Sequence, residues 1–262
     1  MLSTLANYQL IARNITASLQ RVAEKPQVHR EAEHYLARIE KIDTIEQFLA
    51  DDRVYRFAME ACGLKDMIYA KAFMRKVLKE GVDSPESFAN QLADNRFRDF
   101  ARRFNFKSFG ASATTFERTR SEVVNDYIRL KLEEEAGESN EGVRLALYFQ
   151  RKAPGLRNGY DILADKALMK VAETILGHSL VHGDIDRNAR IVEKRLKITE
   201  LSDPGKLTRF LARFATMWEM NAAPSGIPSG NGAANALMTG SFGGGISQDI
   251  LQTLQGLKIG GI

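Results

Sequence analysis

The sequence has 262 residues, of which 44% are hydrophobic and 27% charged, values typical of a globular protein with a sizeable core. Its single cysteine, Cys62, excludes an internal disulfide framework and a multi-cysteine metal site. The formal net charge of +4 is small and charges of both signs are interspersed, so we expect no nucleic-acid partner.

No apolar run approaches the roughly 18 residues that a membrane-spanning helix needs. The first 25 residues include Arg13 and Arg21 and lack an uninterrupted apolar core of signal-peptide length. We therefore expect neither a membrane span nor a cleavable leader.

The first segment has apolar residues at alternating steps of three and four, the spacing of one side of a helix. This N-terminal stripe consists of Leu5, Tyr8, Ala12, Ile15, Leu19 and Val22. It predicts a single helix that ends before Pro26. Four members of the stripe are candidates for contact with another helix, namely Leu5, Tyr8, Ile15 and Leu19.

Further helices follow almost without pause to about residue 220. The same apolar spacing predicts a second helix through Val28, Ala32, Tyr35, Ile39 and Ile42, and Thr44 with Gln47 forms a capping-box pattern that starts a third. Ser84 and Asp203, each before a proline, are predicted N-caps. Helices are expected to stop at Gly63, Gly81, Gly137 and Gly177. Strand alternation is absent, so we predict an all-α multi-helix bundle.

A phrase recurs within this bundle. LADDRVYRFAMEACG begins at Leu49 and LADKALMKVAETILG begins at Leu163, and in each copy an aspartate, Asp51 or Asp165, is placed to cap a helix. Both copies continue into an amphipathic helix and then into SPESFANQLA or DPGKLTRFLA. The repetition predicts two duplicated helical units, about 49–104 and 163–220. The alternative is that Leu-Ala-Asp is simply a common solution at helix junctions.

The segment between these units is also expected to be helical. Phe116, Val123, Tyr127 and Leu130 indicate one long helix, which finishes in an acidic run at 133–135. We interpret this run as a solvated helix end. It is no calcium loop, because it lacks alternating oxygen ligands and a turn glycine.

Two groups of residues resemble metal ligands. His178 and His182, with Asp184 and Asp186, lie in a helix connection, where Asp184 is better explained as a helix cap. Glu31 and His34 have the spacing found in di-iron bundles, but no second Glu-x-x-His motif accompanies them, and we interpret them as surface residues. We therefore expect no metal site and no cofactor.

Other features associated with chemistry have structural explanations. No phosphate-binding or dinucleotide-binding glycine motif and no nucleophile elbow is present. We expect Cys62 to be a buried, inert thiol. NRFRDFARRFNFKSFG mixes phenylalanines with basic residues, but Phe97, Phe100 and Phe104 share one helical face, which predicts core packing beneath a solvated basic face.

Several phrases resemble a bacterial family of unknown biochemical activity that is found with flagellar genes in alphaproteobacteria. They are YQLIARNITASLQRVAEKPQVHREAEHYLARIEKIDTIEQFLADDR, AMEACGLKDMIYAKAFMRKVLKEG, and RLALYFQRKAPG followed by ILADKAL. The resemblance extends from residue 1 to about residue 220. It implies a helical protein concerned with the flagellum and motility, and it supplies no catalytic or ligand-binding residues.

The C-terminal region differs from the helical domain, 1–220. Residues 221–262 hold ten of the twenty glycines but only two charged residues, so 221–246 is predicted to be a Gly/Ala/Ser-rich linker. Beyond it, 247–259 is predicted to be a short amphipathic docking helix, which needs a surface to fold against. The apolar residues of this region are further candidates for protein interaction, namely Ile246, Ile250, Leu251, Leu254 and Leu257.

The sequence therefore favours a non-enzymatic, flagellum-associated structural or assembly protein. It would act through helix-mediated contacts with other flagellar proteins or with itself, and no small-molecule substrate is expected. The alternative is a cytoplasmic accessory factor, such as an export chaperone or regulator. An enzyme would need several ionisable groups gathered in a pocket, and the sequence offers no such group.

Overall fold

The computed structural model describes residues 3–180 and 184–222, and within these ranges every regular element is helical, which confirms the all-α prediction. Contacts divide the chain into two units, Met1–Met220 and Asn221–Ile262. The last described helix ends at Ala222, so most of the predicted linker and the whole docking helix lie outside the described residues.

The first half of the chain holds ten α-helices, whose bounds are α1 Thr4–Arg13, α2 Ile15–Ala23, α3 Pro26–Ile39, α4 Ile45–Ala50, α5 Asp52–Ala61, α6 Lys71–Glu80, α7 Phe88–Gln91, α8 Asn95–Arg103, α9 Phe106–Phe109 and α10 Ser121–Ser139. The second half holds α11 Glu141–Lys152, α12 Gly159–Leu163, α13 Lys166–Leu176, α14 Ile185–Leu196 and α15 Pro204–Ala222. Short 3₁₀ turns, η1 to η5, join some of them at Lys65–Met67, Gly110–Thr114, Glu117–Thr119, Ala153–Gly155 and Ile198–Glu200.

Two hydrophobic cores lie within Met1–Met220. The first core involves α2 to α10 and is rich in aromatic contacts, such as the tilted pair of Phe48 with Phe104 at 5.0 Å and the stacked pair of Tyr35 with Phe57 at 4.6 Å between centroids. The second core involves α10 to α15 and is built around Phe149 and its neighbours, together with Tyr8 from α1. Burial of such side chains is the main favourable term in folding, so each core stabilises its own part of the bundle.

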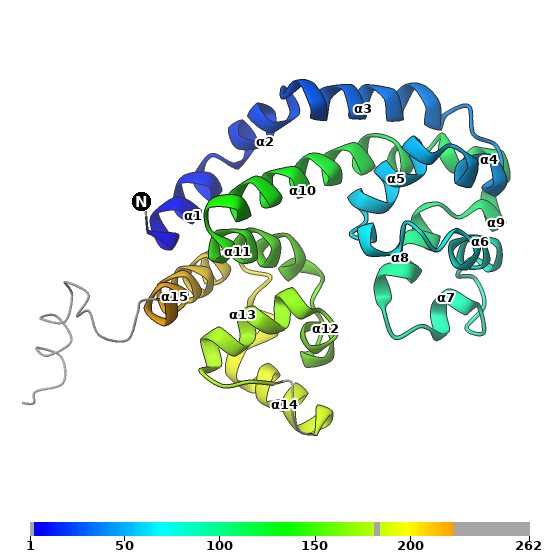
Figure 1. The fold of residues 1–262 in the computed structure, drawn as a ribbon. Helices are drawn as coiled ribbons and strands as arrows, with labels where there is room; N and C mark the ends of the chain where they lie inside the picture. Colours follow the sequence, from blue (N-terminus) through cyan, green and yellow to red (C-terminus); the bar gives the residue numbers. More distant parts are fainter. Residues whose placement is uncertain (1–2, 181–183, 223–262) are drawn as a thin grey trace, which may run out of the picture. The chain divides into compact units, whose positions relative to one another are not determined.

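Helices α10 and α11 form an antiparallel pair (Figure 1), in which α10 contributes to both cores and α11 to the second. Helix α10 packs against α2, α3, α5 and α11, while α11 packs against α1 and α13. On α10, Leu132 belongs to the first core and Ala136 to the second. The boundary between the cores therefore passes through the last two turns of α10.

Most predicted helix caps are confirmed. Thr44 and Gln47 form a capping box at the start of α4, and the Asp51, Asp165 and Asp184 carboxylates accept backbone N–H groups at the starts of α5, α13 and α14. Asp203 accepts the Lys206 N–H at the start of α15. Gly63, Gly81 and Gly177 follow their helices with φ of 75°, 63° and 74°, the region in which glycine is favoured.

The predicted single N-terminal helix is wrong. The chain leaves the helical conformation at Asn14, with φ −121° and ψ 44°, and forms α1 and α2 as separate helices. The break lets α1 pack on α11 with Tyr8 in the second core, while Ile15, Leu19 and Val22 of α2 pack in the first core. Packing against two different cores thus overrides the continuous pattern of the N-terminal stripe.

Three further boundaries differ from the expectation. Gly137 does not end a helix but lies inside α10, where an added Cβ would come within 2.6 Å of the Arg144 side chain on α11. Ser84 accepts the Glu86 N–H in a turn, and the helix begins only at Phe88. Phe116 precedes α10. Close helix approach explains the glycine, and a turn replaces the predicted cap at Ser84.

The two proposed repeat units begin in the same way. A short helix, α4 or α12, contacts both the Asp-capped helix that follows it and the next helix along, α6 or α14. The units then differ, because 84–104 forms α7 and α8 whereas the corresponding part of the second unit is the single helix α15. The internal duplication stays a prediction.

The contact between α12 and α14 generates a stability prediction. A Cβ added to Gly159 would lie 2.3 Å from the Ala189 carbonyl oxygen, a backbone atom that cannot move without shifting α14. We expect Gly159→Ala to lower the free energy of unfolding by about 1–3 kcal/mol, as overpacking does. Urea denaturation monitored by circular dichroism measures the change.

The control is Gly155→Ala, because no atom lies within 4 Å of a Cβ at that position. An unchanged unfolding midpoint for Gly159→Ala would contradict the close packing of α12 on α14.

Candidate functional site

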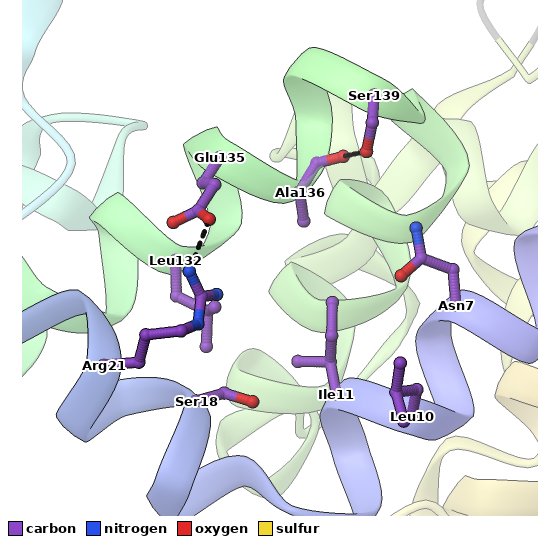
Figure 2. Close-up of a pocket in the computed structure, with 9 residues that line it drawn as sticks. All are labelled: Asn7, Leu10, Ile11, Ser18, Arg21, Leu132, Glu135, Ala136 and Ser139. Carbon is purple, nitrogen blue, oxygen red and sulfur yellow. Dashed lines mark hydrogen bonds and ion pairs between the residues drawn. The ribbon is translucent and has the colours of Figure 1, made fainter.

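The described surface has an open groove of about 280 Å³ where the N-terminal helices meet α10. Figure 2 shows Ile11 of α1 pointing into it, towards Leu132 and Ala136 of α10. Leu10 lies beside Ile11 and remains 59% exposed. Tyr8 of α1 belongs to the second core and α2 to the first, and Ile11 packs against both, so the groove lies where the two cores meet.

The polar residues of this groove lie towards its two ends (Figure 2). At one end Arg21 donates to Glu135 at 2.7 Å, and at the other lie Asn7 and Ser139. The middle is lined by aliphatic side chains. Such a surface offers van der Waals contact and a few hydrogen bonds, and the only charges that line it neutralise each other.

Glu135 is held by two cations. Lys25 donates to its other oxygen at 2.8 Å, in addition to Arg21. Partial burial raises the pKa of Glu135, but the hydrogen bonds from Lys25 and Arg21 outweigh this effect and lower the pKa overall. The interaction therefore stabilises the fold at neutral pH, and this contribution is lost as the pH falls through the lowered pKa of the folded state.

The neighbouring Glu133 corrects the interpretation of 133–135 as a solvated helix end. Its side chain is only 3% exposed and receives two hydrogen bonds from the Arg151 guanidinium of α11, at 2.7 and 2.8 Å. Arg129, one turn earlier on α10, lies 3.5 Å from the same carboxylate. A buried carboxylate with a bidentate arginine partner is a structural connection between helices, not a solvated surface group.

The polar network continues from Arg151 into the second core. The Arg151 guanidinium lies 5.0 Å from the centre of the Tyr148 ring, and the Tyr148 hydroxyl donates to Asp165 at 2.6 Å. Burial, and next the Asp165 carboxylate, raise the pKa of Tyr148. Asp165 also caps α13, so one chain of interactions joins α10, α11 and α13.

The remaining glutamate of the run, Glu134, forms ion pairs with lysines beside the first core. Lys131 donates to it at 2.8 Å and also to Glu60 of α5 at 3.2 Å, and Lys65 lies 3.5 Å from it. Each glutamate of 133–135 thus pairs with a different part of the bundle.

The structure places the predicted interaction residues of the N-terminal stripe mostly inside the chain's own packing. Tyr8 is 1% exposed, and Ile15 and Leu19 are half-buried against the first core; Leu5 is half-buried. The groove instead presents Leu10 and Ile11, which the stripe did not include. From the sequence alone, two neighbouring apolar residues at 10 and 11 do not indicate a groove. They do so only once the helix break at Asn14 is known. The other predicted interaction residues, Ile246, Ile250, Leu251, Leu254 and Leu257, lie outside the described residues.

The two metal-like motifs do not form clusters. Glu31 pairs with Arg53 at 2.9 Å, and the hydrogen bond from Arg53 lowers the pKa of the Glu31 carboxyl group. His178 is exposed and contacts the Leu176 carbonyl, while His182 lies outside the described residues. Within residues 3–180 and 184–222 no three acidic, histidine or cysteine side chains gather as metal ligands would.

Core packing of the aromatic–basic stretch is confirmed. Phe97, Phe100 and Phe104 are buried. Several of the intervening basic residues have acidic partners: Arg96 pairs with Asp94 and Asp66, and Arg103 pairs with Asp126 at 2.6 Å. This pairing removes much of the positive charge that a phosphate backbone would need.

Comparisons with known proteins identify relatives of this chain. A family model described as "Protein of unknown function (DUF1217)" matches residues 61–207. An X-ray structure of a protein from Agrobacterium tumefaciens is similar over 85% of this chain and 98% of its own, with 45% sequence identity and a TM-score of 0.79. No curated protein matches the sequence significantly.

Across the described part of the chain, no helix has both the length and the apolar character needed to cross a membrane.

The buried carboxylate generates a second prediction. Glu133→Gln leaves Arg129 and Arg151 without their anionic partner, so we expect the free energy of unfolding to fall by about 3 kcal/mol. The matched control is Glu135→Gln two residues later, whose partners are more exposed and for which we expect less than about 1 kcal/mol. Urea unfolding of both variants measures the difference, and equal effects would argue against a special role for Glu133.

The single cysteine, Cys62, generates a third prediction. Burial raises the pKa of the Cys62 thiol to about 11, and Arg103 contacts the sulfur at 3.8 Å. At pH 8 we expect iodoacetamide to modify Cys62 on the order of a hundredfold more slowly in the folded chain than in urea, because the thiolate fraction is that much smaller. Mass spectrometry of timed samples measures both rates; equal rates would exclude a suppressed thiolate.

Proposed function

Because the chain belongs to the DUF1217 family, whose function is unknown, its role has to be inferred from its own residues, and we propose a non-enzymatic, flagellum-associated structural or assembly protein. It works through helix-mediated contacts with other flagellar proteins or with further copies of itself.

The observation that carries this proposal is the groove between α1, α2 and α10. Its middle is lined by Leu10, Ile11, Leu132 and Ala136, and its one acid–base pair is internally satisfied. Catalysis generally requires several ionisable groups that point towards one place and are not already neutralised by ion pairs. An aliphatic floor with small polar groups at the ends suits the side of an amphipathic helix instead.

The flagellar part of the proposal is supported by the sequence phrases quoted above. They resemble a family found with flagellar genes and cover the same helical region, 1 to about 220. Flagellar axial subunits have a similar plan, in which helices from both chain ends pack in the assembled tube. In this chain the N-terminal helices that line the groove, α1 and α2, and the apolar residues of 247–259 are the corresponding elements.

A substitution in the groove tests the proposal. Leu10 is 59% exposed, so Leu10→Glu is expected to leave the fold stable while placing a charge where a partner helix would pack. We expect this variant to reduce swarming in soft agar and to weaken co-purification with flagellar proteins by at least tenfold. Thr16→Glu, on the side of α2 opposite Ser18, is the matched control and should swarm normally.

Location distinguishes the two versions of the proposal. A structural component is expected in purified hook–basal bodies and in immunogold labelling of flagella. A cytoplasmic accessory factor would instead co-purify with an unassembled subunit and be missing from the organelle. Normal motility and assembly in strains carrying either Leu10→Glu or a deletion of 247–262 would count against both versions.

A further inference from the structure

We propose that α1 is an exchangeable helix: it can leave its place on α11, and the α1 helix of a second copy can take that place, giving a reciprocally swapped dimer. The proposal goes beyond the flagellar role and does not depend on it. It is based on the disagreement between the sequence pattern and the structure at Asn14.

The apolar pattern of 4–23 is that of one continuous helix. Its apolar spacing of three and four residues runs through Asn14 without interruption, and neither glycine nor proline occurs in this range. In the structure only Asn14 leaves the helical conformation, and its side chain makes no capping hydrogen bond to α2. The broken and the continuous forms therefore differ in the backbone of essentially one residue, which is the property of a hinge.

The contacts of α1 are mostly with the second core, and of its side chains Ile11 alone also packs against the first core, in which α2 lies. Helix α1 packs on α11, is anchored by Tyr8 in the second core, and is held at its start by a 3.0 Å hydrogen bond from the Asn140 amide to the Thr4 hydroxyl. Helix α2 packs on α10 in the first core. Straightening at Asn14 would thus release α1 while α2 stays in place.

A released α1 leaves two apolar surfaces, its own face with Tyr8 and the uncovered side of α11. The structure shows that these two surfaces fit each other, so a second copy that has also straightened supplies a ready partner. Such an exchange is reciprocal, closes with two-fold symmetry and repeats the contacts of the monomer. Within one chain the high effective concentration of α1 favours the monomer, so the dimer is expected to increase with protein concentration.

Crosslinking tests whether α1 of one copy reaches α11 of another. Differently tagged chains carrying Thr4→Cys and Asn140→Cys, both with Cys62→Ser, are unfolded together, refolded at high concentration and treated with a short bismaleimide. We expect a crosslinked species containing both tags. Replacing the Asn140→Cys chain by Lys79→Cys, an exposed position on α6, gives the background from random collision.

Hinge variants of the otherwise natural chain test the mechanism without introduced cysteines. Asn14→Ala favours the continuous helix by about threefold per hinge, so the dimerisation constant should rise about ninefold. Asn14→Gly disfavours the continuous helix and should lower that constant. Sedimentation equilibrium measures both, and circular dichroism verifies that both variants are folded.

Two results would overturn the exchange. One is a mixed-tag crosslink no stronger than that of the Lys79→Cys control at every concentration. The other is the same dimerisation constant for Asn14→Ala and Asn14→Gly, which would show that the hinge does not govern association.

Discussion

The bundle depends on one buried carboxylate that is paired with an arginine. Glu133 lies on α10 between Leu132, which packs in the first core, and Ala136, which packs in the second. Removing a carboxylate from water costs several kcal/mol unless its lone pairs are satisfied, and the bidentate Arg151 guanidinium satisfies them here. Because that geometry exists only when α10 and α11 are aligned in one register, the pair specifies how the two helices lie together. Helix α10 contributes to both cores and α11 to the second, so the register of this pair helps to position the second core against the first.

Helix α10 is unusual in having packing partners on several sides, and its polar residues follow from that. Each charged group that points towards a neighbouring element meets a partner there: Asp126 meets Arg103 of α8, Lys131 meets Glu60 of α5, and Glu135 meets Arg21 of α2. An ordinary surface helix would have one apolar stripe and one solvated side. Surrounded as it is, α10 instead carries alternating apolar and paired charged contacts around its circumference.

Features decided within one turn of chain were predictable from the sequence, and features decided by distant partners were not. The caps at Thr44, Asp51 and Asp165 need only a side-chain oxygen and the N–H groups two or three residues later, so their pattern is local. The pairing of Glu133 with Arg151 joins residues 18 positions apart, and nothing in an acidic run reveals which glutamate will be buried. The break at Asn14 is still harder to predict from the sequence. The local apolar pattern favours a continuous helix, and the helix is divided only because its two halves pack against different cores. The groove was missed for the same reason, because it exists only after that break brings Leu10 and Ile11 beside α10.

The groove and the exchange of α1 are coupled by geometry. Asn7, Leu10 and Ile11, which form one wall of the groove, are all residues of α1. The groove therefore exists only while an α1 helix occupies its place on α11, whether that helix belongs to the same chain or to a second copy. A ligand shifts an equilibrium by the difference in its affinity for the two states, so a helix bound in the groove favours the forms with α1 in place over the form with α1 released. By the same linkage, release of α1 weakens groove binding by an equal factor. Exchange of α1 between copies passes through the released form, so a helix bound in the groove opposes the opening step that exchange requires.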